Sequence, residues 1–241
     1  MLGMLFWQVM KMQATVDTFD ERISEIDLYY SALDQLYLSK ITSNSDEKYL
    51  EDDFLKILKS NALLMIYNLV ESTIMGGVLE IYSAFSQHGI TYKMVRREIQ
   101  DIWFSFKFNQ VYDKNAHYHS YRDKASEIIT SILSEDTLSL DRKATDISGN
   151  LDADKIRIIC QDHGIHFSLD RKCRGGVVLS DVKDKRNNLA HGTISFVECG
   201  RDYSIEDLTK IKNETVFFLK DILNGMKEYC DNRLYLSASN Q

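Results

Sequence analysis

The stretch ALLMIYNLVESTIMGGVLEIYSAF, from Ala62 to Phe85, decides the fold of this chain. Apolar residues occupy nearly every side of this stretch when it is wound as an α-helix, which indicates burial on several faces. The run that contains it, from Lys48 to about Phe85, has no proline to interrupt a helix. The sequence therefore predicts one long helix at the centre of the domain.

The rest of the chain favours helices as well. Its 241 residues include no proline and only 11 glycines, and 44% of them are apolar. Residues 15–39 repeat apolar side chains at steps of three and four, which is typical of an amphipathic helix. Ser204 and Asp207 form a capping box for a last helix that reaches about Leu236. The expected fold class is mainly α, a helical bundle with brief strands at IHFSL (165–169) or GGVVL (175–179).

We expect a single helical domain over residues 14–241, with the less regular segment 109–176 as a possible insertion. The start, MLGMLFWQVM, is too short to span a bilayer and lacks the features of a signal peptide. Residues 1–13 are either an extension from an upstream start, because Met10 and Met12 could each begin a shorter product, or an extra helical turn.

Charge and cysteine content limit the classes of function. A net charge of -7 argues against a protein that coats nucleic acid non-specifically, since that needs a broad cationic face. The four cysteines are widely spaced, with no CxxC pair. This usage fits a reducing cytoplasm, with no membrane attachment.

The segment Arg186-Asn187-Asn188-Leu189-Ala190-His191-Gly192 carries the chemistry. Arginine is a permanent, planar cation that grips phosphate, and histidine can take or give a proton near neutral pH. We expect a helix that Ser180 caps and Gly192 ends. On a straight helix Asn187 and His191 lie about 40° apart, whereas Arg186 and His191 lie about 140° apart. Both side chains reach one phosphate only if the last turn unwinds or a second copy supplies its own motif.

The spacing alone is weak evidence, because Arg157 and His163 fit a looser form of the same pattern. The simpler alternative for Arg186 and His191 is a salt bridge or a favourable cation at the helix end.

The surroundings of the motif resemble the HEPN superfamily. Asn187 follows the arginine, Ala190 and Gly192 flank the histidine, and two stretches, YNLVESTI (67–74) and VKDKRNNLAHGTISFVECGRDYSIEDL (182–208), look like a bacterial HEPN-nuclease branch of toxin and defence systems. The resemblance implies a HEPN-like bundle, a metal-independent endoribonuclease, and a homodimer whose two motifs line one cleft. An antitoxin or defence-system partner is implied too. Thr193 stands where adenylylated HEPN toxins carry tyrosine, so that form of inhibition is not predicted.

Side-chain chemistry then assigns roles. RNA carries its own nucleophile, the 2′-hydroxyl, so His191 would transfer the proton, Arg186 would hold the phosphate and Asn187 would orient His191 or the scissile group. The products would be a 2′,3′-cyclic phosphate and a 5′-hydroxyl, without a metal or other cofactor. Basic residues near the motif are candidates for RNA-backbone binding: Lys183, Lys185 and Arg174. Glu71 and Asn68 would support the site from the long helix, or instead form a buried pair that fixes helix register.

Two further alternatives stay open. Cys160, His163, His166 and Cys173 are metal-capable side chains at short spacings, although they match no standard zinc ribbon. The whole protein could also be a non-catalytic helical module that binds RNA or a protein partner.

Overall fold

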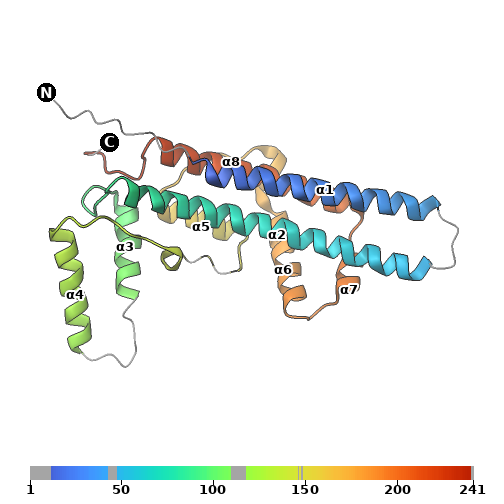
Figure 1. Cartoon of the computed structure of the whole chain (residues 1–241), viewed down its shortest axis with the longest axis horizontal. Helices are drawn as coiled ribbons and strands as arrows, with labels where there is room; N and C mark the ends of the chain where they lie inside the picture. The colour runs from blue at the N-terminus through green and yellow to red at the C-terminus, as the bar shows by residue number, and fades with distance from the viewer. Residues whose placement is uncertain (1–11, 43–47, 110–117, 146, 148, 240–241) are drawn as a thin grey trace.

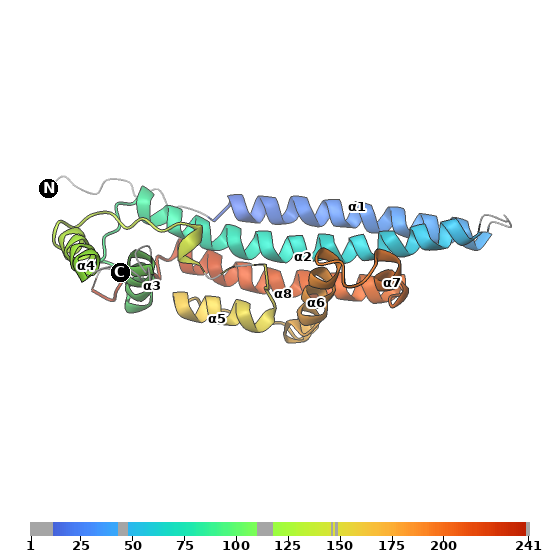
Figure 2. The same cartoon turned by 90° about the horizontal axis from the view of Figure 1, so that it is seen from below.

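Three long helices form the body of the protein, as a computed structural model describes it for residues 12–42, 48–109, 118–145, 147 and 149–239. They are α1 (Ala14–Thr42), α2 (Lys48–Gln87) and α8 (Ile205–Asp231). Both views show them side by side, with α1 and α2 antiparallel (Figures 1 and 2). Because α2 packs against both others, it is the central helix, as its sequence predicts.

The apolar circumference of α2 is buried in the bundle. Leu63, Ile66, Ile74 and Val78 are all fully buried. Residues 52–87 are long and apolar enough to cross a membrane by length and composition, but 56% of the most apolar window lies inside the fold. That burial is what a core helix requires, so this stretch gives no evidence of a membrane span.

Shorter elements cover the bundle. At one end lie α3 (Arg97–Asn109) and α4 (Tyr118–Leu133), and the 3₁₀ turn η1 (Arg142–Ala144) follows. Next come α5 (Ala153–His163) and the 3₁₀ turn η2 (Arg171–Gly176), which packs on α8. The helices α6 (Val178–Ala190) and α7 (Phe196–Arg201) both pack on α2. The fold is all-α, and the described residues contain two isolated β-bridges but no strand.

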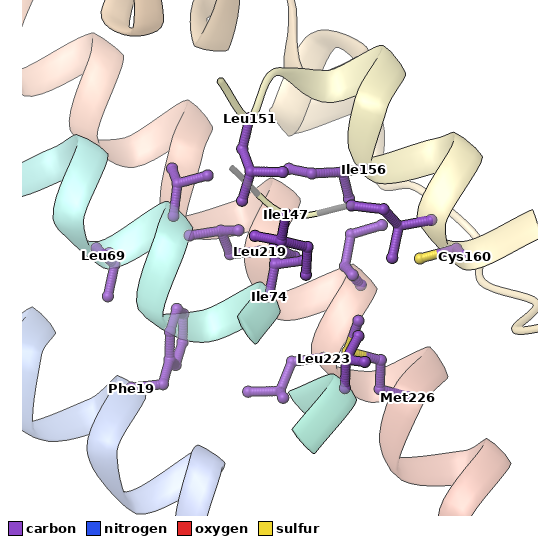
Figure 3. Close-up of a cluster of buried hydrophobic side chains, with 14 of the residues drawn as sticks. Phe19, Leu69, Ile74, Ile147, Leu151, Ile156, Cys160, Leu219, Leu223 and Met226 are labelled. Atoms are coloured by element: carbon purple, nitrogen blue, oxygen red, sulfur yellow. The ribbon is translucent and has the colours of Figure 1, made fainter. Parts of the chain in front are cut away.

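Part of the middle segment enters the core. Ile147 and Leu151 are 5% and 1% exposed, and Figure 3 shows them among side chains of α2, α5 and α8. The backbone N–H of Leu151 donates to the hydroxyl of buried Tyr67 on α2, at 3.1 Å. These contacts place Ile147 and Leu151 against α2.

Several predicted element boundaries are confirmed and others are wrong. The capping box of Ser204 and Asp207 is present. The last helix ends at Asp231 rather than Leu236, because Arg233 turns the chain with φ 52° and Leu236 then pairs with Val95. The predicted brief strands are absent. Residues 165–169 form no regular element, and Gly175 and Gly176, with φ of 69° and 76°, turn the chain directly into α6.

The connection after the motif is fixed tightly to α2. A Cβ built on Gly200 of α7 would lie 1.9 Å from the backbone oxygen of Lys56, so only glycine permits this approach. The hydroxyl of Ser60 donates to the carbonyl of Phe196 at 2.6 Å. These two contacts anchor α7 to α2 directly after the turn. Residues 1–11 of the predicted N-terminal extension lie outside the described part, so the extension stays a prediction. The insertion at 109–176 also stays a prediction.

Candidate functional site

The Arg-Asn-x-x-x-His motif occupies the last turn of α6. The helix begins at Val178, so Ser180 lies inside it and the cap predicted there is wrong; Val177 stands at that position without a side-chain cap. The C-terminal end of α6 lies just before Gly192, as the sequence predicts. Gly192 has φ 68°, and its N–H donates to the carbonyl of Leu189 at 3.2 Å. The N–H of Thr193 donates to the carbonyl of Asn188 at 2.9 Å, which completes a Schellman motif.

The last turn therefore does not unwind toward the glycine. His191 is the C-cap, with φ -89° and ψ -3°, and its N–H donates to the carbonyl of Asn187 as in a helix. Since helical geometry continues through His191, the angular offset between Arg186 and His191 persists. The imidazole is exposed at the tip of α6.

Arg186 points from α6 onto α2. Its guanidinium lies over the ring of Tyr67, 4.5 Å from the ring centroid. Its Nη1 donates to the carbonyl of Gly149 at 3.0 Å and to Oδ1 of Asn187 at 2.8 Å. Burial raises the pKa of Tyr67, so this ring stays neutral beside the cation. Stacking and two hydrogen bonds hold the arginine side chain in one orientation.

Glu71 faces two arginines at once. Its Oε2 lies 3.7 Å from Nη2 of Arg186, and its Oε1 lies 4.0 Å from Nη2 of Arg142 on η1. Both distances exceed hydrogen-bond length, so the two ion pairs are loose. The carboxylate is 25% exposed. The predicted supporting residue Glu71 thus lies beside the motif.

Asn68 does not. It is exposed on the side of α2 that faces α1, where it lines a shallow cavity of about 80 Å³ with Arg22 and Glu25. The alternative of a buried Asn68–Glu71 pair is also wrong, because Asn68 is exposed and Glu71 contacts arginines. Asn68 and Glu71 lie one turn apart on α2, but the first faces α1 and the second faces the motif.

Asn187 connects the motif to the middle segment. Its Nδ2 donates to Oδ1 of Asn150 at 2.7 Å, while its Oδ1 accepts from Arg186. The amide is thus engaged with the loop and the arginine. In this single chain those contacts position Arg186 rather than His191.

The three basic residues predicted to bind RNA are not gathered at one surface. Lys183 pairs with Asp152 at 2.7 Å and Lys185 with Asp202 at 2.9 Å, and each of these hydrogen bonds raises the pKa of its lysine. Arg174 lies on η2 and pairs with Glu214 of α8 at 3.4 Å. The lysines lie on α6 with their charge compensated, and Arg174 belongs to the α8 side.

The zinc alternative and the second Arg-His pair both fail on the surroundings of His163. This side chain is buried, its Nδ1 donates to the carbonyl of Ile159 at 2.7 Å, and the Tyr82 hydroxyl donates to its Nε2 at 2.7 Å. Both ring nitrogens are used, so His163 is a neutral core residue. Over the part of the chain that the structure describes, no three His, Cys, Asp or Glu side chains group as a metal site.

Buried His163 predicts a loss of stability in acid. Burial lowers its pKa below the unfolded value near 6.5, so the unfolded chain takes up a proton that the folded chain resists. The stabilisation is complete above pH 6.5 and falls as the pH drops through the folded pKa, by at most about 1.4 kcal/mol per pH unit for one proton. Urea unfolding of wild type and His163→Gln between pH 5 and 7.5 checks this. A wild-type pH dependence that His163→Gln leaves unchanged would assign it to other groups.

The sequence alone missed three members of this site. Tyr67 lies within a predicted core run, and Arg142 and Asn150 lie in the less regular segment 109–176. Each reaches the motif through tertiary contacts: the ring beneath Arg186, the second arginine on Glu71, and the amide bonded to Asn187.

A known family matches this chain over nearly its whole length. Residues 12–235 match the family described as MAE_28990-like HEPN. No match was found among curated proteins or among solved structures. The match spans all the helices, including the motif at the end of α6 and the long α2. With its all-α bundle and nearly full-length match, this chain belongs to the HEPN superfamily.

Proposed function

We propose that this protein is a metal-independent endoribonuclease. A HEPN domain indicates a nuclease or RNA-related function in general terms. The observation that carries the finer proposal is the pairing on α6 of a fixed guanidinium, stacked on Tyr67, with an exposed imidazole at the helix tip. A held cation and an accessible proton carrier are the two groups that phosphodiester transfer within RNA needs.

The proposed reaction uses the RNA's own 2′-hydroxyl. His191 accepts the hydroxyl proton as the 2′-oxygen attacks phosphorus, and a protonated His191 donates a proton to the departing 5′-oxygen. Arg186 stabilises the negative charge that builds on the non-bridging oxygens. The P–O5′ bond breaks as the P–O2′ bond forms. The products are a 2′,3′-cyclic phosphate and a 5′-hydroxyl, with no cofactor in the balance.

The active form is proposed to be a homodimer. Within one chain Arg186 turns toward α2 while His191 turns to solvent, so one copy's histidine would meet the other copy's arginine in a shared cleft. The physiological role is proposed as a cytoplasmic toxin or antiviral effector, restrained by an antitoxin or defence-system partner.

The direct test is cleavage in the presence of a chelator. Purified protein incubated with total RNA in EDTA should cut it, and the fragments should carry 2′,3′-cyclic phosphate and 5′-hydroxyl ends. Polynucleotide kinase with ATP should label the 5′ ends without prior phosphatase treatment. RNA that stays intact, or ends bearing a 5′-phosphate, would contradict the proposed chemistry.

The second candidate function is a non-catalytic HEPN module that binds RNA or a protein partner. The observation that favours it is the satisfied state of the arginine: Gly149, Asn187 and Glu71 all engage Arg186 within the chain. Such a module would bind RNA or a partner in EDTA without generating new ends, which separates it from the nuclease.

A further inference from the structure

Arg142 sits beside the motif on a turn that its own neighbours fix. The Asp141 carboxylate caps η1 by accepting from the N–H of Lys143 at 2.7 Å. The Thr145 hydroxyl donates to the carbonyl of Arg142 at 2.8 Å. Leu140 before this turn and Ile147 after it are buried in the core. The backbone of Arg142 is therefore held in place although its side chain is 66% exposed.

The charges around Glu71 do not cancel. One carboxylate faces two guanidiniums, those of Arg186 at 3.7 Å and Arg142 at 4.0 Å. The three groups together carry one net positive charge. Because neither pair is within hydrogen-bond length, the N–H groups of Arg142 are not committed to Glu71.

We infer that Arg142 is a second phosphate-binding residue, which contacts an RNA-backbone phosphate next to the phosphate held by Arg186. Arginine offers a planar fork of donors that matches phosphate oxygens, and a loosely paired, exposed one can turn to a ligand at little cost. The inference rests on the proposed function, since it takes RNA as the ligand of this site. It gives the acidic protein a second cation at the site, which Lys183 and Lys185 do not supply because they are paired with aspartates.

The neighbouring residue provides a matched control. Lys143 is also exposed and also lies on η1, but it lines a separate cavity with Glu98, Asp101 and Asp162. Arg142→Gln and Lys143→Gln therefore remove the same charge from adjacent positions of one turn. Only the first removes it from the Glu71 cluster.

The test measures binding without cleavage. The probe is a fluorescein-labelled, single-stranded 2′-O-methyl RNA of 20 nucleotides, which has no free 2′-hydroxyl to attack. Fluorescence anisotropy of the full chain at several salt concentrations should give roughly fivefold to tenfold weaker binding for Arg142→Gln than for wild type. The slope of log K against log salt should fall by about 0.7, the value for one phosphate contact on a single strand. Lys143→Gln should leave both quantities near wild type.

Equal affinity and equal slope for the two variants, or no binding of the probe by wild type, would overturn the inference. Circular dichroism of both variants verifies that the bundle is intact. The binding result does not depend on catalysis. If Arg142→Gln weakens binding but the wild type never cuts RNA, the inference about Arg142 stands and the nuclease proposal fails. If the wild type cuts RNA but Arg142→Gln binds the probe as well as wild type does, the nuclease proposal stands and the inference fails.

Discussion

The His191→Ala protein should lose RNA cleavage, with kcat lowered by about 10² to 10⁴ because general acid–base catalysis by a positioned side chain contributes that much. The fold should not change. His191 is exposed, and the helix end depends on its backbone N–H and on Gly192, both of which the variant keeps. Cleavage of a labelled RNA under single-turnover conditions, in EDTA, measures the effect.

His166→Ala is the matched control. His166 is likewise exposed but lies in the irregular segment before η2, where its backbone carbonyl lies close to Gly225 of α8. Its removal should leave kcat near wild type. Equal cleavage by the His191→Ala and wild-type proteins would refute the proposed role of His191, and a loss shared by both histidine variants would point to a general effect on the protein rather than to proton transfer.

Local signals were enough for the parts of the fold that local energetics determine. The apolar circumference of residues 62–85 predicts the buried central helix, and the capping box at Ser204 predicts where α8 begins. Gly192 predicts the end of α6, because a left-handed residue is needed there. In each case the decisive interaction joins residues within a few positions of one another, so the sequence contains it.

The site itself depends on contacts between distant positions. Glu71 and Asn68 are three residues apart, yet one meets Arg186 and the other faces α1, and only the packing of α1 and α6 on α2 decides which. The sequence predicts that Lys183 and Lys185 bind RNA. In the structure, however, each of them is paired with an aspartate, Asp152 and Asp202 respectively. A pattern along the chain records which charges exist but not which are compensated.

The geometry of α6 narrows the ways in which Arg186 and His191 could act on one phosphate, and so makes the dimer hypothesis testable. An unwound last turn was one way to bring Arg186 and His191 to a single phosphate, and the regular helix with its Schellman end removes that option for this chain. Arg186 is held against Tyr67 while His191 projects from the helix tip. If both act on one phosphate, the histidine and the arginine come from different copies.

Two inactive variants should then restore each other. In a heterodimer of Arg186→Gln and His191→Ala subunits, one of the two shared sites keeps both its arginine and its histidine, while the other site has neither. We expect each homodimer to be nearly inactive and the heterodimer to recover about half of the wild-type rate, since a two-fold assembly has two equivalent sites. Glutamine at position 186 removes the positive charge and keeps a polar N–H donor on a shorter side chain.

Co-expression with two different affinity tags and sequential purification isolates the heterodimer for single-turnover cleavage. A heterodimer of two differently tagged His191→Ala subunits controls for wild-type contamination and should stay inactive. If each chain instead carried a complete site, the Arg186→Gln subunit would lack its arginine and the His191→Ala subunit its histidine. Every site would then be broken, and the mixed heterodimer would be as inactive as either parent. Recovery of activity therefore requires that the arginine and the histidine of one site come from two chains.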